Sequence, residues 1–346
     1  MAGYFDESRL DDQTALGQLD HTLRALAGAG ARVRRAAAEA ADAITAGVEA
    51  NRDTRPRAVI AAGPDSRLLR AVLEPWCPVP FVAWPSAALP GWAGSLDLVV
   101  ILAPERSDPA AASAVAEAVR RGCQVVVACE ADSMVAEHAA GRWTTILPTD
   151  TGDQLATAVV MLDYLHRVGL GPETDAEEVA HALDVVAIAC SPHRDLAVNP
   201  AKILAITLAD ATPLIWGGSV LAARAARRIA ESVRRDSGRG ALAGDAEHLL
   251  PVLEAARPRD VFADPFADPG SEAGGEPRAV LLVLDDGAED PVTREQGGRL
   301  RTAAAEHDVR VETIGAEGAS EVARYASLLL QGGYASAYLS LGLADE

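Results

Sequence analysis

The strongest constraint on the fold is the alternation of short apolar runs with helical stretches along most of the chain. The first set of apolar runs occupies residues 58–62, 78–84, 96–103, 123–129 and 144–148. Runs that are apolar at nearly every position are typical of strands buried on both faces, and alternation with helices at this pitch indicates βαβ units with right-handed crossovers. The sequence therefore predicts an α/β fold built on doubly wound parallel sheets.

The alternation returns in the C-terminal half. Strands are expected at 212–218, 279–286 and 309–315, and helices at 175–190, 199–210, 219–235, 291–307 and from about residue 318. A helical pattern also runs from Asp11 to about Asn51, and a break rich in glycine and proline follows the helix expected at 151–168. The prediction is an N-terminal helical lead-in (1–55), a first domain (56–170) and a second domain (171–346).

One segment of the second domain differs in composition from its surroundings. Residues 256–278 are rich in proline, glycine and acidic side chains. Such a composition favours a long loop without secondary structure of its own. We expect this loop to be mobile.

Charge and cysteine usage exclude several classes of protein. The formal net charge is -19, and a field of this sign repels nucleic acid and anionic membranes. No uninterrupted apolar stretch reaches the roughly 18 residues of a membrane span, and the N-terminus lacks a signal-peptide pattern. The four cysteines show no metal-ligand spacing. We therefore expect a cytoplasmic protein with reduced structural thiols, without nucleic-acid or membrane binding and without a resident metal or cofactor.

Four phrases, in their order and spacing, resemble one enzyme family. They are ALPGWAGSLDLVV (88–100), RRGCQVVVAC (120–129), NPAKILAITLADATPLIWGG (199–218) and LLLQGGYASAYLSL (328–341). The sequence is similar in these phrases to the bifunctional phosphoglucose/phosphomannose isomerases, whose fold is a pair of sugar isomerase (SIS) domains. The resemblance runs nearly end to end. It implies two SIS-type domains after the helical lead-in and a homodimer, with the near-terminal helix as an expected interface element.

The resemblance also implies a reaction. The family interconverts aldose and ketose forms of a hexose 6-phosphate, an intramolecular oxidoreductase-type isomerisation that needs a phosphate site, a ring-opening group and a carboxylate base. Its phosphate lies on a Ser-x-Ser-Gly-x-Thr stretch, where this chain reads Ala-Pro-Glu-Arg-Ser-Asp at 103–108, and its Gly-Met-Gly-Gly-Ser turn corresponds to Ala-Gly-Pro-Asp-Ser at 62–66. The substrate-binding candidates carried over by position are Ser66, Arg67, Arg106, Ser107 and Asp108.

The chemistry of these loops departs from the family. At ~4 Å and a surface-like dielectric, each carboxylate beside a phosphate costs on the order of 4 kcal/mol per unit-charge pair. Taken by themselves, the residues favour helix capping, by Asp108 before Pro109 and by Asp65 or Ser66 at the helix that follows them. The family's arginine in a Pro-Arg dipeptide is replaced by Asp153-Gln154.

The second domain supplies weaker candidates. The family's base lies in a Glu-Asn-Ala-Lys segment that is not found in residues 231–251, which leaves Glu231 and Asp236 as candidate bases. Glu231 is equally explained as an exposed helix residue paired with Arg235. His248 is the nearest match to the family's ring-opening histidine. The ligand-facing turn of this domain is expected at Gly217, Gly218 and Ser219. The final residues, 343–346, contain no lysine at the place where the family has one.

Two function hypotheses follow. The first is a carbohydrate-derivative-binding protein of the isomerase type that acts on a sugar phosphate, with His248 opening the ring and Glu231 or Asp236 as base. The second is a catalytically inactive relative that binds a sugar phosphate or a partner protein and acts in regulation. A cation site formed by Asp65, Glu105 and Asp108 is a further alternative, because hard cations take oxygen ligands.

Overall fold

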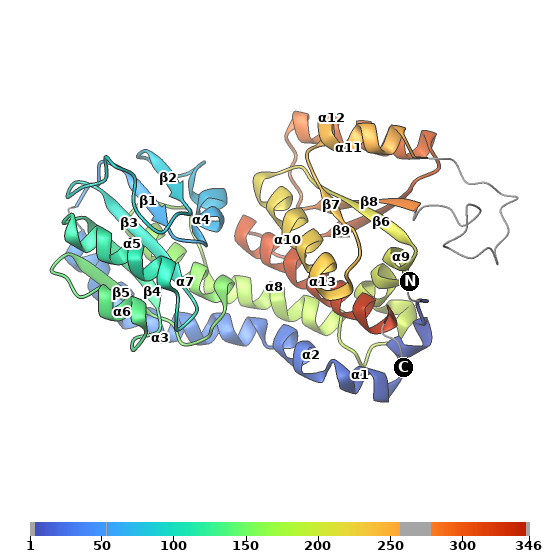
Figure 1. Cartoon of the computed structure of the whole chain (residues 1–346), viewed down its shortest axis with the longest axis horizontal. Coiled ribbons are helices and arrows are strands. Elements are labelled where there is room, and N and C mark those ends of the chain that lie inside the picture. The colour runs from blue at the N-terminus through green and yellow to red at the C-terminus, as the bar shows by residue number, and fades with distance from the viewer. Residues whose placement is uncertain (1–3, 53, 257–277, 344–346) are drawn as a thin grey trace, which may run out of the picture. The chain divides into compact units, whose positions relative to one another are not determined.

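The computed structural model describes residues 4–52, 54–256 and 278–343 (Figure 1). The loop expected to be mobile, at 256–278, lies outside the described residues except for its two ends. The chain divides into two compact units. The first-sheet unit consists of residues 29–181, and the second-sheet unit consists of residues 1–28 together with 182–346. The domain boundaries expected from the sequence stay predictions.

The first sheet has five parallel strands in the order β2-β1-β3-β4-β5. The strands are β1 (Val59–Ala62), β2 (Phe81–Trp84), β3 (Leu98–Ala103), β4 (Gln124–Cys129) and β5 (Thr144–Pro148). Every residue of β1 and β3 is buried, which explains why these strands appear in the sequence as unbroken apolar runs. Strand β2 lies on one side of β1, and β3, β4 and β5 follow on its other side, so the strand order reverses between β1 and β3.

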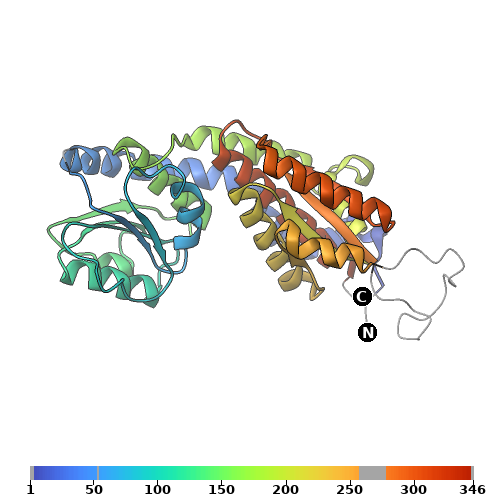
Figure 2. The same ribbon diagram turned by 90° about the horizontal axis from the view of Figure 1, so that it is seen from above.

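Helices cover both faces of this sheet. They are α3 (Ala29–Asn51), α4 (Ser66–Leu73), α5 (Pro109–Arg120), α6 (Met134–His138) and α7 (Gln154–Arg167), followed by α8 (Ala176–Ala189), within which the two units divide. Helices α5 and α6 pack on the face that presents Ile60, Val99 and Val127. Figure 2 shows α3 and α7 on the opposite side of the sheet. The predicted doubly wound α/β fold is confirmed for this unit.

The second sheet repeats the arrangement with four parallel strands in the order β7-β6-β8-β9. They are β6 (Ala211–Gly217), β7 (Leu242–Ala243), β8 (Arg278–Asp285) and β9 (Arg310–Gly315). Here the reversal falls between β6 and β8. The strand order is that of the first sheet without a fifth strand, so the two units are structural repeats, as the alternating pattern indicates.

The second-sheet unit is also helical on both faces. Its helices are η1 (Glu7–Leu10), α1 (Gln13–Gln18), α2 (Asp20–Ala27), η2 (Leu196–Val198), α9 (Pro200–Ala209), α10 (Val220–Ser237), α11 (Ala246–Glu254), α12 (Pro291–Glu306) and α13 (Glu321–Leu343). Helices α11 and α12 pack on one face with Leu214 and Leu281. Helices α9, α10 and α13 pack together on the other face (Figure 1). Most residues of α13 are buried inside this unit, which leaves little of the helix for the dimer interface predicted for it.

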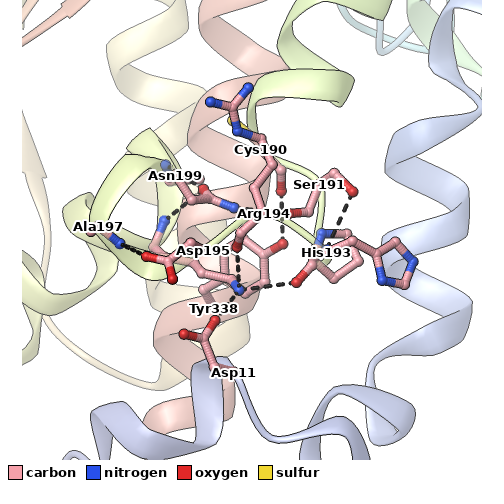
Figure 3. Close-up of polar contacts among 12 residues, drawn as sticks. Asp11, Cys190, Ser191, His193, Arg194, Asp195, Ala197, Asn199 and Tyr338 are labelled. Carbon is pink, nitrogen blue, oxygen red and sulfur yellow. Dashed lines mark hydrogen bonds and ion pairs between the residues drawn. The ribbon is translucent and has the colours of Figure 1, made fainter.

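A buried lysine ties the N-terminal segment to the second-sheet unit. The Lys202 side chain is fully buried, and its Nζ donates to Asp11 Oδ1 at 2.6 Å and to the carbonyls of Pro192 and Arg194 at 3.0 Å each. Figure 3 shows Asp11 on one side of this network and Tyr338 beside it. The Tyr338 hydroxyl donates to the Cys190 carbonyl at 2.7 Å. All three ammonium hydrogens have acceptors, so Lys202 is a structural anchor.

Several short elements were not expected from the sequence. They are the helix α6, the two-residue strand β7, the helix α11, which contains Pro251, and the 3-10 helices η1 and η2. The segment from Asp11 to Asn51, expected to be helical, forms three helices, α1, α2 and α3, that are divided at Leu19 and Gly28. Among the described residues, no helix combines the length and the apolar character needed to cross a bilayer.

Candidate functional site

The reversal point of the first sheet carries a cavity. In open parallel sheets, ligands bind at the carboxyl ends of the strands where the strand order reverses. A cavity of about 210 Å³ lies there, lined by Pro64 and Asp65 after β1 and by Pro104, Glu105, Ser107, Asp108 and Pro109 after β3. The structure therefore brings the two loops singled out in the sequence to one place.

Asp108 occupies the N-terminus of α5 with its own carboxylate. The backbone N–H of Ala111 donates to Asp108 Oδ1 at 2.9 Å, and Pro109 at the first helical position has no N–H to offer. The capping role predicted for Asp108 is confirmed. A carboxylate thus lies at the helix terminus where the resemblance places the phosphate, and it uses one of the donors that a phosphate would need.

The start of α4 is arranged differently. Asp65 stands at the N-cap position but makes no capping hydrogen bond with its side chain, so the capping role expected there is wrong. Its carboxylate instead accepts a hydrogen bond from the Gln154 side chain at the start of α7. Ser66 is the first residue of α4, is only 1% exposed, and its hydroxyl has no hydrogen-bond partner. Gly63, before this turn, has a φ of +88°, which favours glycine.

The arginines of the two loops do not face an open anion site. The Arg106 guanidinium donates to Glu130 Oε1 at 3.0 Å and also pairs with Asp132. Arg67 is exposed on α4. The pKa of Glu130 lies above its usual range because burial disfavours the carboxylate, and Arg106 opposes this without reversing it. Arg106, a predicted substrate ligand, is thus engaged by two acidic side chains.

A cation missed by sequence reasoning lies at the start of α7. Arg32 on α3 pairs with Asp153 at 2.7 Å, and both side chains are largely buried. Asp153 also caps α7 by accepting from the backbone N–H groups of Leu155 and Ala156. The family's arginine is absent from this position in the sequence, but an arginine 121 residues earlier is brought there by the fold. No local pattern points to this pair.

The second sheet places the predicted glycine turn at its own reversal point. Gly217 ends β6, and an added Cβ there would collide with the backbone of Ala222, so β6 and α10 approach too closely for a side chain. Ser219 caps α10, with its hydroxyl accepting from the Ala222 N–H at 3.0 Å and donating to Asp286. An added Cβ on Gly218 would collide with the side chain of Thr293. The three residues therefore form the tight turn expected of them.

The three candidate catalytic residues do not gather at one place in this unit. Glu231 is exposed on α10 and pairs with Arg228 at 2.9 Å, not with Arg235 as expected. Asp236, near the end of α10, accepts from the Ser336 hydroxyl at 2.7 Å and pairs with Arg235. Helix α10 runs away from Ser219 at about 1.5 Å per residue, so both carboxylates lie far from the glycine turn.

His248 has a different surrounding. It lies on α11 and, with Arg227, Leu242 and Gly244, lines a cavity of about 410 Å³ beside the end of β7. Neither Glu231 nor Asp236 lines this cavity. Of the three catalytic candidates, His248 alone lines this cavity.

A metal site is not formed by the described residues. No group of three or more histidine, cysteine or acidic side chains within the described ranges is placed to hold a metal ion. The alternative of a cation bound by Asp65, Glu105 and Asp108 is therefore not supported, since Asp108 caps α5 and Asp65 binds Gln154. All four cysteines are unpaired, and burial raises the pKa of Cys190 to about 12.

Comparison with known proteins identifies the scaffold. Residues 197–343 match the family model described as the bacterial phospho-glucose isomerase C-terminal SIS domain. A search of curated proteins finds no match. Several solved structures superpose on this chain over nearly its whole length.

The tagatose-6-phosphate ketose/aldose isomerase of Escherichia coli superposes with a TM-score of 0.64 at 13% identity, covering 96% of this chain and 94% of that one. A hypothetical protein from Thermus thermophilus gives 0.61 at 13% identity, covering 94% and 90%. The C-terminal domain of glucosamine-fructose-6-phosphate aminotransferase from Francisella tularensis gives 0.56 at 9% identity, covering 90% and 94%. At these identities the likeness shows the fold.

Residues 197–343 are thus similar to the C-terminal SIS domain of bacterial phosphoglucose isomerases, and the whole chain has the SIS-type fold with two parallel sheets after N-terminal helices. This confirms the recognition and the fold class expected from the sequence.

Proposed function

We propose that this protein binds a carbohydrate derivative at the carboxyl edge of its first sheet and does not isomerise hexose 6-phosphates. The observation that carries the proposal is the carboxylate of Asp108 on the N-terminus of α5, at 2.9 Å from the Ala111 nitrogen. This carboxylate takes the position at which the family resemblance expects a phosphate. A phosphorylated sugar held in the family's pose would meet a negative charge there.

The lining of the cavity suits hydroxyl groups. Asp65, Glu105 and Ser107 present acceptors around about 210 Å³, and carboxylates accept hydrogen bonds from neutral polyols at no charge penalty. The SIS scaffold adds the expectation of a sugar or sugar phosphate as ligand, because its relatives include a tagatose-6-phosphate isomerase. The ligand class we propose is therefore a sugar or sugar derivative bound through its hydroxyls.

The proposal of binding without turnover rests on the surroundings of this cavity. Isomerisation needs an acid or base within hydrogen-bond reach of the reacting carbon. Of the described residues that line the cavity, none is a histidine, lysine or cysteine, and Asp65 and Asp108 are both held by other groups. Glu105 is the remaining carboxylate of the lining, and no ring-opening histidine or lysine lines the cavity with it. A regulatory role, a homodimer and a cytoplasmic location belong to the same proposal.

The test combines ligand-induced thermal stabilisation with a coupled isomerase assay. Glucose, mannose and glucosamine are compared with glucose 6-phosphate, mannose 6-phosphate and fructose 6-phosphate. We expect stabilisation by at least one unphosphorylated sugar, a loss of that stabilisation in Glu105→Gln and Ser107→Ala, and no isomerase turnover. Turnover of any hexose 6-phosphate by the wild-type protein would overturn the proposal.

A charge-only variant tests the role of Asp108. Asn is an equally good helix cap, so Asp108→Asn keeps the cap and removes the charge. The matched control is Asp12→Asn, because Asp12 caps α1 by accepting from the Ala15 N–H at 2.7 Å and lies in neither loop of the cavity. Affinity for a hexose 6-phosphate should rise about tenfold, equivalent to about 1.4 kcal/mol, in Asp108→Asn and stay unchanged in the control. Equal affinities in the two variants would contradict the charge argument.

A further inference from the structure

Two arginines of the second-sheet unit lack the partners that buried arginines usually have. Arg224 on α10 and Arg324 on α13 are half-buried, and the Nε atom of each is buried without a hydrogen-bond acceptor. Among the described residues, neither guanidinium has a carboxylate within ion-pair distance, although acidic side chains outnumber basic ones 50 to 31 in this chain. Buried polar groups without partners are rare and costly, and charged ones most of all.

Both arginines lie near the carboxyl edge of the second sheet. Helix α10 starts at Val220, directly after β6, and helix α13 starts at Glu321, after β9. Arg324 is in the first turn of α13, and Arg224 is about 6 Å along α10. The two helices pack against each other on one face of the sheet (Figure 1).

Arg324 reaches the point where the strand order reverses. Its Nη1 lies 3.4 Å from the position that a Cβ on Gly287 would take. Gly287 follows β8 and has a φ of +73°, so a glycine is favoured both by the backbone and by the guanidinium beside it. The guanidinium therefore lies beside the loop that leaves β8, opposite the Gly217–Ser219 turn that leaves the neighbouring strand β6.

Arg224 lies beside a buried tyrosine. Tyr325 is 2% exposed, its pKa is raised by burial, and the Arg224 guanidinium opposes that shift. Tyr325 follows Arg324 on α13, so Arg224 lies at the contact between α10 and α13. Since arginine only donates hydrogen bonds, its guanidinium N–H groups need acceptors.

The local electrostatics favour an anion. The N-terminal turn of a helix carries partial positive charge, and a cation there is unfavourable unless an anion neutralises it. Two acidic side chains of the β8 loop are already engaged: Asp285 accepts from the Gly287 N–H at 3.0 Å, and Asp286 accepts from the Ser219 hydroxyl. Two arginines at two helix starts without a carboxylate partner form an arrangement that binds a tetrahedral oxyanion well, because guanidinium groups donate pairs of parallel hydrogen bonds to phosphate oxygens.

We propose that Arg224 and Arg324 bind a phosphate group, either inorganic phosphate or a phosphate monoester, at the carboxyl edge of the second sheet. The site is separate from the cavity of the first-sheet unit, and it stands whether or not a sugar binds there. It provides a binding site for a dianion on a protein whose net charge is strongly negative.

The test is titration with inorganic phosphate at constant ionic strength set with potassium chloride, followed by thermal unfolding and calorimetry. Phosphate should stabilise the wild-type protein, and Arg324→Gln and Arg224→Gln should each weaken its binding at least tenfold. Arg299→Gln is the matched control, since Arg299 is an exposed arginine on α12 of the same unit. Asp286→Asn should strengthen binding by removing a nearby negative charge.

Three results would overturn the proposal: no stabilisation beyond that of chloride, equal weakening in Arg299→Gln, or unchanged binding in both arginine variants. Arg324→Lys keeps the charge and loses the planar fork, so it should bind with intermediate affinity and covers the case in which a glutamine variant fails to fold. Comparing inorganic phosphate with glucose 6-phosphate distinguishes the two sources, because an ester that binds more than tenfold tighter must also contact the protein through its sugar.

Discussion

Asp11 and Lys202, 191 positions apart in the chain, form an ion pair of 2.6 Å in which the lysine side chain is fully buried and the aspartate is about half exposed. The pair joins the N-terminal segment to α9, and the Pro192 and Arg194 carbonyls complete the shell of the ammonium. Because a buried charge is stable only while its partners remain, this contact holds the start of the chain on the second-sheet unit.

Removing the carboxylate from this pair should destabilise the protein. Asp11→Asn leaves the buried ammonium without its counter-ion, and we expect a loss of about 2 kcal/mol in the free energy of unfolding, because water at half-exposed Asp11 replaces part of the interaction. Urea unfolding measures the loss. Asp20→Asn is the control, since Asp20 pairs with Arg24 at the surface, where the side chains are 56% and 80% exposed. An equal loss of stability in the two variants would contradict the special role of the Asp11–Lys202 pair.

The glycine that ends β6 should not tolerate a side chain. The added Cβ of Gly217→Ala would collide with the Ala222 backbone, which cannot move without shifting α10. We expect a loss of about 1–3 kcal/mol, the usual cost of overpacking. Gly240→Ala is the comparison, because no atom lies within 4 Å of its added Cβ. Thermal unfolding measures the loss of stability in each variant. Equal losses in Gly217→Ala and Gly240→Ala would mean that β6 and α10 do not approach as closely as described.

Two glutamates of the first-sheet unit should respond to pH with opposite signs. The pKa of Glu130 is raised by burial, so the folded protein binds this proton more tightly than the unfolded chain does. The stability that Glu130 contributes is therefore lost as the pH rises above the ordinary pKa of 4.5. The pKa of Glu117 is lowered by hydrogen bonds from Arg120 and Arg121, so its contribution is present above 4.5 and is lost as pH falls.

Unfolding midpoints at pH 4 and pH 7 test this difference. From pH 4 to pH 7, Glu130→Gln should gain stability relative to the wild type, and Glu117→Gln should lose stability relative to the wild type. The same sign of change in both variants would contradict the assigned environments. The two substitutions change the same chemical group, so each serves as the control for the other.

Most of the fold could be predicted because its central strands consist largely of apolar residues. Residues 98–103 are all buried, whereas the other six-residue strands of the described chain, β4 and β9, each include residues that are only partly buried or exposed. The elements that were missed lack this signal. Strand β7 has two residues, neither of them buried, and α11 contains Pro251, which disfavours a helix in any reading of the sequence alone.

The candidate site was predictable only where its chemistry is local. Asp108 followed by Pro109 is a capping signal within two residues, and the structure confirms it. Arg32 and Asp153 meet only through the packing of α3 and α7. Arg224 and Arg324 look in the sequence like ordinary solvated helix residues, since a missing partner becomes visible only when three-dimensional neighbours are known.

Lys202 is the only lysine in the sequence, and its amine lies in the interior. Reagents that acylate primary amines therefore do not reach the one lysine side chain while the protein is folded. Acylation of Lys202 would report that the network around its ammonium has opened and that the Asp11 contact has separated.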